Sequence, residues 1–315
     1  MGKLKALLLT EGMHGMISQV EGMAKALDAE YSHKIVRLSF PWNLIPPKFS
    51  PISEIVLKDK IYLTENETPD LIISCGRKSI VPSIILKKKN PKIFTIHIQD
   101  PKVNHKNFDI IIAPEHDNLS GKNIHISKGA IHYITEVEIN QAKSYLADKI
   151  KSKKIVSLIL GGPNKYYNFD DDQLINIFNE IKSKFVSKDY KIIVIPSMRT
   201  PKKIIELAKK EMSSCGHVVS SVDKQAYLSA YALADYVVVT CDSTSMISEA
   251  ATSGKPIFVA HMRAKKNNYR FKRFFELFKQ MRIIRDLGEE IESWTYNKHN
   301  EAQRIATEIK NKIKN

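Results

Sequence analysis

Residues 236–260 read YVVVTCDSTSMISEAATSGKPIFVA. The β-branched run at 236–240 predicts a buried parallel strand, because strands covered on both faces are apolar throughout. The hydroxyl and carboxylate residues at 242–244 then predict the N-terminus of a short helix. Gly254 predicts the end of that helix, ahead of a second strand over 257–260. The stretch is therefore a β-α-β unit of a parallel α/β sheet.

The start of this predicted helix carries the residues that point to a ligand. Ser243, Thr244 and Ser245 place hydroxyl groups where a helix N-terminus presents free N–H groups and a partial positive charge. Such a site holds a phosphate without a lysine, and Asp242 supplies part of the cap. Glu249 follows one turn further along the same side, where a carboxylate suits the diol of a ribose. Two interpretations stay open: a nucleotide diphosphate site, or a capped β-α-β unit with a solvated glutamate.

Length and composition indicate a globular protein with two domains of ordinary size. The chain has 315 residues, of which 43% are hydrophobic and 26% charged. Its formal net charge of +15 predicts some attraction to phosphates or anionic lipid. Much of that charge is lysine scattered over the sequence, which needs no function to explain it. The charge alone therefore adds little to the case for an anionic partner.

Cysteine usage and hydropathy indicate a cytoplasmic protein. Three cysteines without CxxC spacing predict a reducing compartment, no disulfide framework and no zinc site. The first apolar run, residues 4–9, is too short for a signal peptide, and no run is long enough to span a bilayer. Peripheral contact with the inner face of the membrane stays open. Phenylalanines at 271, 274, 275 and 278 have helical spacing, so we expect them to face the core and expect no nucleic-acid partner.

Predicted strands and helices alternate along the chain in two successive halves. Each half opens on a strand and a glycine loop, so we expect an N-terminal domain over 1–152 and a C-terminal domain over 153–315. We expect two doubly wound, Rossmann-like domains that face each other across a cleft, as in the glycosyltransferase B-like fold. The terminal helix over 299–313 is expected to pack toward the N-terminal domain. The first glycine loop has G-x-x-G spacing, so the dinucleotide fingerprint G-x-G-x-x-G is absent.

Candidate residues of the N-terminal domain follow the ends of its predicted strands, where α/β sheets place ligand contacts. We expect His14 to take the proton of an acceptor hydroxyl, with Glu115 and Asp117 as weaker choices; the alternative is a loop histidine with local hydrogen bonds only. No metal is expected, because the acidic pair has no further ligand at a suitable spacing. The other candidates at this edge are Gly12, Gly15, Gln19, Gly76 and Arg77.

Candidate residues of the C-terminal domain are expected to hold the nucleotide-sugar. Gly161 and Gly162 follow a strand and allow a ligand to approach the backbone closely. Ser197 and Arg199 follow the next strand, and an arginine there suits a phosphate or base contact. With the helix start at 242–245 and Glu249, they make up the predicted nucleotide-sugar site.

One segment breaks the regular alternation. Residues 40–57 contain four prolines interleaved with large apolar side chains, which excludes a regular helix or a central strand. This segment either enters a lipid interface, lines an acceptor site, or is a long connection packed on its domain. We favour the last of these interpretations.

These motifs resemble the family named for the plant mitochondrial fission, or elongated-mitochondria, protein. Bacterial members of that family are often labelled nucleoside-diphosphate-sugar epimerases, and the plant member is understood as an adaptor that recruits a dynamin-type GTPase to the outer mitochondrial membrane. This sequence departs from the family at Met198, where a second basic residue is usual, and at Met281, where a glycine is usual. The matching residues are Gly12, 14–15, Gln19, 69–70, 74–77, 99–101, 113–117, 129–132, 161–162, 166–167, 197, 199–201, 240–246, 249–250, 254–256 and 270–271.

The resemblance and the residues together lead to one expected function and one alternative. We expect a metal-independent, glycosyltransferase-like enzyme that binds a nucleotide-diphospho-sugar, uses no cofactor and acts on a lipid-linked or membrane-associated acceptor. An epimerase of the dehydrogenase type is less favoured, because the dinucleotide fingerprint is absent. The alternative is a non-catalytic adaptor that uses the same fold to recruit a protein or a membrane.

Overall fold

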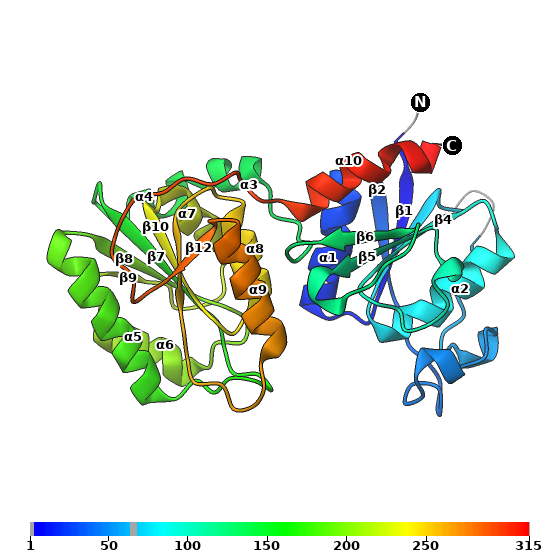
Figure 1. Ribbon diagram of the computed structural model, residues 1–315, viewed down its shortest axis with the longest axis horizontal. Helices are drawn as coiled ribbons and strands as arrows, with labels where there is room; N and C mark the ends of the chain where they lie inside the picture. The colour runs from blue at the N-terminus through cyan, green and yellow to red at the C-terminus, as the bar shows by residue number, and fades with distance from the viewer. Residues whose placement is uncertain (1–2, 64–67, 315) are drawn as a thin grey trace. The chain divides into compact units, whose positions relative to one another are not determined.

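The computed structural model describes residues 3–63 and 68–314, which fold as two compact units. Unit 1 comprises Met1–Tyr133 with Asn300–Asn315, and unit 2 comprises Ile134–His299. Each unit holds one six-stranded parallel sheet with helices packed against it (Figure 1). The predicted fold class, α/β with two Rossmann-like domains, is confirmed in each unit.

The sheet of unit 1 has the strand order β2-β1-β3-β4-β5-β6, and all neighbouring strands are parallel. Successive side chains of its apolar strands point to opposite faces, so that α1 and α10 cover one face and α2 covers the other. The strands are β1 Lys5–Thr10, β2 Glu30–Ile35, β3 Leu71–Cys75, β4 Phe94–Ile98, β5 Ile110–Pro114 and β6 Ile124–Ser127. The helices are α1 His14–Ala26, α2 Ile80–Lys89 and α10 Glu301–Lys314, with short 3-10 helices η1 Pro47–Phe49, η2 Glu54–Val56, η4 Arg77–Ser79, η5 His105–Asn107 and η6 Glu115–Asp117.

The sheet of unit 2 has the strand order β12-β11-β10-β7-β8-β9, again all parallel. α5 and α6 pack on one face, and α7 contacts the other through the Ser157 hydroxyl, which donates to the carbonyl of Ala230. The strands are β7 Ile155–Leu160, β8 Lys191–Pro196, β9 Gly216–Val218, β10 Tyr236–Thr240, β11 Ile257–Ala260 and β12 Ile284–Asp286. The helices are α3 Glu136–Gln141, α4 Ser144–Ala147, α5 Asp171–Lys184, α6 Lys202–Met212, α7 Lys224–Leu233, α8 Thr244–Ala251 and α9 Tyr269–Gln280, with the 3-10 helix η7 Val186–Lys188.

The boundary between the units differs from the predicted one at residue 152. Residues 134–152 belong to unit 2, because α3 and α4 pack on α7 of that unit. The Ser229 hydroxyl joins the two segments: it accepts from the backbone N–H of Leu146 at 3.1 Å and donates to the carbonyl of Lys143 at 3.2 Å. The chain returns to unit 1 at residue 300, and the apolar side of α10 packs in the same core cluster as α1.

The phenylalanines of α9 face the core of unit 2, as their helical spacing predicts. Phe274, Phe275 and Phe278 are buried in unit 2. The three cysteines, all within the described residues, are buried and free. Over residues 3–63 and 68–314, no helix is both long enough and apolar enough to cross a membrane.

Two glycines of α1 give a matched test of the packing in unit 1. A Cβ at Gly22 would lie 2.2 Å from the carbonyl oxygen of His132, whereas a Cβ at Gly15 would meet nothing within 4 Å. We expect Gly22→Ala to lower the free energy of unfolding by about 1–3 kcal/mol, because the clash is with backbone. Gly15→Ala should raise it by about 0.5 kcal/mol through helix propensity. Urea unfolding followed by circular dichroism measures both, and equal midpoints for the two variants would contradict this packing.

Candidate functional site

The strand order of unit 2 reverses between β7 and β10. From β7 the chain proceeds outward to β8 and β9 on one side, and from β10 to β11 and β12 on the other. The loops that leave the carboxyl ends of β7 and β10 therefore lie next to each other, and parallel α/β sheets bind ligands at such a point. These loops contain Gly161 and Gly162 after β7 and Asp242 after β10.

The Asp242 carboxylate joins the loops at this point. Its side chain is fully buried, and Oδ2 accepts from the backbone N–H of Gly162 at 3.1 Å and from Nη2 of Arg199 at 2.7 Å. Oδ1 accepts from the Thr240 hydroxyl at 2.7 Å. Burial raises the pKa of Asp242, and the positive charge of Arg199 acts against that rise. The ion pair therefore keeps a carboxylate stable inside the protein.

The two glycines let these groups come together. A Cβ at Gly161 would lie 2.2 Å from both carboxylate oxygens of Asp242, and a Cβ at Gly162 would lie 2.0 Å from the carbonyl oxygen of Arg199. The close approach that a glycine allows is thus used by the protein's own loops. Arg199 also donates from Nη1 to the Gly162 carbonyl at 2.8 Å, and its side chain is 39% exposed.

The first turn of α8 follows directly. Ser243 is its N-cap, and the Ser243 hydroxyl accepts from the backbone N–H of Met246 at 3.4 Å. Ser243, Thr244 and Ser245 are all half-buried and occupy the N-cap and the first two positions of α8, at the positive end of the helix. The arrangement has the donors that an anion at a helix N-terminus requires.

Glu249 lies further along α8, half-buried against α7. Tyr227 of α7 donates its hydroxyl to Oε2 of Glu249 at 2.5 Å, and Tyr231 donates to the Tyr227 hydroxyl at 2.7 Å. Burial raises the pKa of Glu249 to about 7, against the lowering effect of the hydrogen bond from Tyr227. A carboxylate with a raised pKa beside a ligand-binding edge is a functional candidate.

Unit 1 has a point of strand reversal of its own, between β1 and β3. Gly12 follows β1 with φ +86°, and Gly76 follows β3 with φ +94°. Glu11 connects the two loops, since Oε1 accepts from the backbone N–H of Lys78 at 3.0 Å and Oε2 pairs with its ammonium group at 3.2 Å. His14 begins α1 and is exposed, its ring edge-on to Tyr133 at a centroid distance of 6.3 Å.

A family described as mitochondrial fission ELM1 matches residues 14–313. The chain belongs to this family. Its relatives include an uncharacterized protein of Rickettsia prowazekii (strain Madrid E), 27% identical over 92% of this chain and 94% of the relative. The mitochondrial fission protein ELM1 of Arabidopsis thaliana is 26% identical over 79% of this chain, which spans only 65% of the plant protein.

Solved structures support the fold of this ELM1-family chain. The UDP-GlcNAc 2-epimerase of Methanocaldococcus jannaschii has a TM-score of 0.53 and 14% identity, over 98% of this chain and 99% of that enzyme. A UDP-glucosyltransferase of Polygonum tinctorium has a TM-score of 0.50 and 9% identity, over 99% of this chain and 93% of that enzyme. At this identity the likeness concerns the fold alone, which is glycosyltransferase B-like.

The N-terminal candidates of this ELM1-family chain are held in several different ways. Arg77 donates to the backbone carbonyls of Asn43 at 2.5 Å and Ile45 at 2.9 Å. The guanidinium group therefore holds the proline-containing segment in place, whereas the sequence predicted a ligand contact for it. The side-chain amide of Gln19 donates to the carbonyl of Gly15 at 3.1 Å, and its Oε1 accepts from the Cys75 thiol at 3.6 Å.

The acidic candidates of unit 1 lie elsewhere along the sheet edge. Glu115 and Asp117 form η6 after β5, and β3 and β4 lie between β5 and β1, the strand that precedes His14. Oε2 of Glu115 is buried without a hydrogen-bond partner among the described residues. Over the same residues, no three His, Cys, Asp or Glu side chains gather as metal ligands would. The roles of all three residues in proton transfer stay predictions.

Several residues of the unit 2 site were not predicted from the sequence. Thr200 donates to the carbonyl of Gly161 at 2.6 Å, and its hydroxyl lies 3.1 Å from that of Ser197, a predicted candidate that shapes the same loop after β8. Asn164 donates to the carbonyl of Asp242 at 3.0 Å. Tyr227 of α7 gave no signal beyond an amphipathic helix.

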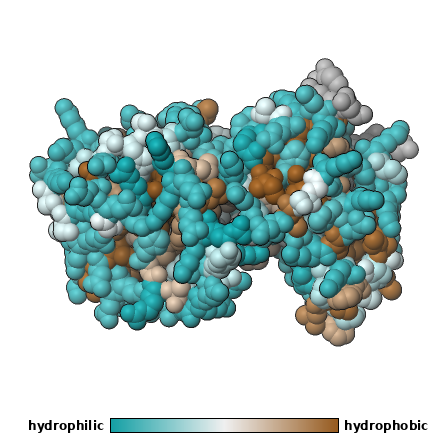
Figure 2. Space-filling model, in the orientation of Figure 1, coloured by the Kyte–Doolittle hydropathy of each residue, from teal (hydrophilic) through white to brown (hydrophobic). Residues whose placement is uncertain are grey.

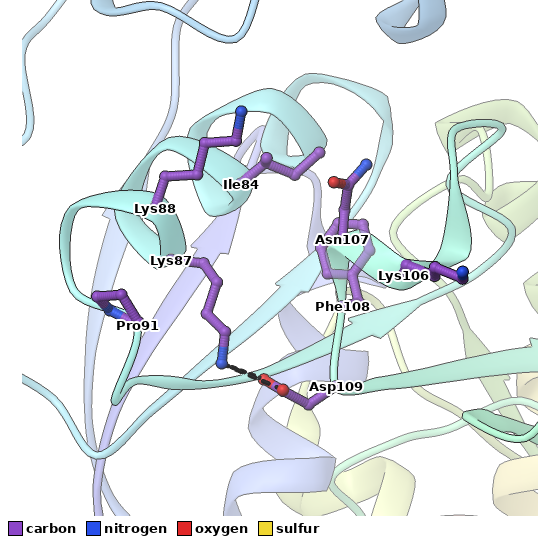
Figure 3. Close-up of a pocket in the computed structure, with 8 residues that line it drawn as sticks. All are labelled: Ile84, Lys87, Lys88, Pro91, Lys106, Asn107, Phe108 and Asp109. Atoms are coloured by element: carbon purple, nitrogen blue, oxygen red, sulfur yellow. Dashed lines mark hydrogen bonds and ion pairs between the residues drawn. The ribbon is translucent and has the colours of Figure 1, made fainter.

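One further hollow lies in unit 1, with a volume of about 370 Å³ (Figure 3). Lys88 and Lys106 lie at its rim, and Lys87 pairs inside it with Asp109 at 2.8 Å. Asp109 also accepts from the Thr95 hydroxyl at 2.8 Å. The hollow lies at the amino ends of β4 and β5, whereas parallel α/β sheets bind ligands at the carboxyl ends of their strands. Its ion pair joins α2 to the start of β5.

Proposed function

We propose that unit 2 binds a nucleotide-diphospho-sugar at the carboxyl edge of its sheet and that the chain acts as a metal-independent, glycosyltransferase-like enzyme without a cofactor. The observation that carries the proposal is the meeting of the β7 and β10 loops at the start of α8. There three hydroxyl residues, Ser243, Thr244 and Ser245, form the N-cap and the first two positions of the helix.

The diphosphate is proposed to sit on the first turn of α8. The helix N-terminus and the hydroxyls supply donors, and the partial positive charge favours an anion. The buried Asp242 carboxylate would repel a phosphate, but Arg199 neutralises it at 2.7 Å. Arg199 remains 39% exposed, so its charge also reaches a ligand outside the loop.

The ribose is proposed to bind Glu249. The Tyr227 hydroxyl donates to Oε2 of Glu249 and so orients the carboxylate. Oε1 is then left to accept from the ribose hydroxyls. A carboxylate that accepts from a diol is stabilised in its charged form, which offsets the burial that raises its pKa to about 7. Holding such a group at the ligand edge is what recognition of a sugar requires.

The base and the reaction are proposed from the chemistry of the site and from the names of the related structures. Both structural relatives described above carry UDP in their names, so uracil nucleotides are the first ligands to test. The positive end of α8 would stabilise charge on a leaving diphosphate without a metal. His14 is the proposed base for the acceptor hydroxyl, and a lipid-linked acceptor is the proposed second substrate.

Calorimetric titration with UDP, GDP, CMP and UDP-GlcNAc tests the donor site. We expect micromolar binding of one nucleotide and at least a hundredfold loss in the Ser243→Ala/Glu249→Ala variant, because each charge-assisted contact accounts for about tenfold or more. A matched control is Ser187→Ala/Glu206→Ala, which changes the same residue types at exposed positions of unit 2. If the folded protein binds no nucleotide, the donor site is refuted and the adaptor alternative takes its place.

A second measurement separates transfer from epimerisation. The protein is incubated with the UDP-sugar that binds, without an acceptor, and the sugar is followed by proton NMR. A transferase-like enzyme leaves the configuration of every ring carbon unchanged, whereas a change at one carbon would reveal an epimerase. His14→Gln is then expected to lower kcat while the Kd for the nucleotide stays the same.

A further inference from the structure

The segment 40–57, here called the proline loop, exposes more apolar surface than its packing requires. Phe40 is 80% exposed, Leu44 71%, Phe49 66% and Ile55 67%. Single exposed apolar side chains are common on proteins, but four large ones within sixteen residues form a patch that marks an interaction site. In Figure 2 brown and tan atoms gather at the lower right, where Figure 1 draws in blue the chain around residue 50.

The inner side of the proline loop is firmly held. Arg77 binds its carbonyls at Asn43 and Ile45, and Ser39 donates its hydroxyl to the carbonyl of Ile55 at 2.9 Å. Trp42 packs on a small core cluster that includes Val56 and Leu57. The expectation that the segment is a connection packed on its domain thus holds for one side only. The exposed side chains are presented on a fixed backbone.

Charge around the loop identifies the kind of partner. Residues 34–62 contain five lysines and arginines against two carboxylates. Both carboxylates are already paired, Glu54 with Lys89 and Asp59 with Arg37. Lys48, Lys58 and Lys60 are exposed and follow the apolar residues closely in the sequence, and the Lys48 ammonium lies 4.6 Å from the ring centroid of Phe49. Cations that border an apolar patch match a surface with negative charge outside and hydrocarbon beneath.

We propose that the proline loop is a membrane-docking surface that inserts Phe40, Leu44, Phe49 and Ile55 into the interface of an anionic bilayer. Lys48, Lys58 and Lys60 then lie at the level of the lipid phosphates. Apolar burial and attraction to anionic lipid add up in this geometry. A second copy of the chain suits the surface less well, because it would bring the same cations together. The proposal does not depend on the nucleotide site.

Vesicle sedimentation with the full chain tests the docking surface. We expect binding to vesicles of phosphatidylcholine with 30% phosphatidylglycerol (about physiological anionic content) and at least tenfold weaker binding to phosphatidylcholine alone. The Leu44→Ser/Phe49→Ser/Ile55→Ser variant should bind the anionic vesicles at least tenfold less. The control Val137→Ser/Met198→Ser/Val222→Ser removes as many exposed apolar side chains elsewhere and should bind like the wild type.

Three outcomes would overturn the proposal. The first is that the wild type fails to sediment with anionic vesicles. The second is that the loop variant binds them as well as the wild type does, which would assign the binding to lysines scattered over the surface. The third is that the wild type binds no vesicles but forms a concentration-dependent dimer that the loop variant does not form, which would assign the surface to a second copy of the chain. Circular dichroism confirms that each variant is folded. The loop variant should keep the nucleotide affinity of the wild type, so failure here is distinct from failure of the donor site.

Discussion

Arg199→Met is expected to lower the free energy of unfolding by about 3 kcal/mol at pH 8, because it leaves a buried carboxylate without its cation. Asp242 is fully buried and pairs with Arg199 at 2.7 Å. Removal of one partner of such a pair costs far more than the pair contributes, since the remaining charge stays in a poorly solvated site. Nucleotide binding, where present, should fall as well, because the unpaired Asp242 would repel a diphosphate.

The loss of stability in Arg199→Met should depend on pH. Burial already raises the pKa of Asp242, and the opposing cation is gone in the variant. A carboxyl group whose pKa is higher in the folded state than in the unfolded state binds more protons when folded, so stability falls as pH rises. Urea unfolding should therefore show a larger deficit at pH 8 than at pH 5. Lys203→Met, which breaks an exposed pair with Asp171, is the control and should cost little. Equal deficits in the two variants would contradict the buried ion pair.

Glu249→Gln is expected to have the opposite effect on stability and to raise the free energy of unfolding by about 2–3 kcal/mol at pH 8. Burial raises the pKa of Glu249 from its ordinary value near 4.5 to about 7. The contribution of Glu249 to the free energy of unfolding is therefore fully present below pH 4.5 and is lost as the pH rises through 7. The loss is about 1.4 kcal/mol for each unit by which the pKa is raised, and it is smaller here because Glu249 is partly exposed to solvent. Glutamine keeps the hydrogen bond from Tyr227 and carries no charge.

Unfolding curves at pH 4 and pH 8 test this prediction. The variant and the wild type should be equally stable at pH 4, where Glu249 is protonated, and should separate at pH 8. Tyr227→Phe should cost more stability in the wild type at pH 8 than in Glu249→Gln, because the phenol binds a charged carboxylate in the wild type and a neutral amide in the variant. If Glu249→Gln is more stable than the wild type and no longer binds nucleotide, the Glu249 carboxylate is retained for function at a cost in stability. A wild type that is the more stable at pH 8 would refute the raised pKa.

The fold was predictable because its signals are local. Apolar strands, the cap at Ser243 and the glycine after each first strand depend on residues within a few positions of one another. The site at the end of β7 was predictable in outline for the same reason. Its inner structure was not, because the contacts join residues about 40 to 80 positions apart, as in Asp242 with Arg199 or Gly162.

Arg77 and Tyr227 show why residue type alone does not assign a role. An arginine after a strand is typical of ligand binding, but Arg77 donates to the carbonyls of the proline loop, which the sequence gives no means to pair with it. Tyr227 looks like any aromatic residue of an amphipathic helix, and its contact with Glu249 depends on how α7 and α8 pack. Both assignments required tertiary structure.

The return of the chain to unit 1 at residue 300 has a consequence for synthesis. Ile305 and Ile309 of α10 complete the core that Val20 and Met23 of α1 begin. When the ribosome has produced all of unit 2, unit 1 still lacks this part of its core, although it was made first. Unit 2 is contiguous, so all residues of its core are available before those of unit 1. We therefore expect unit 2 to complete its core first, which reverses the usual N-to-C order of domain folding. Until α10 is made, the apolar side of α1 that α10 covers in the folded protein lacks its partner.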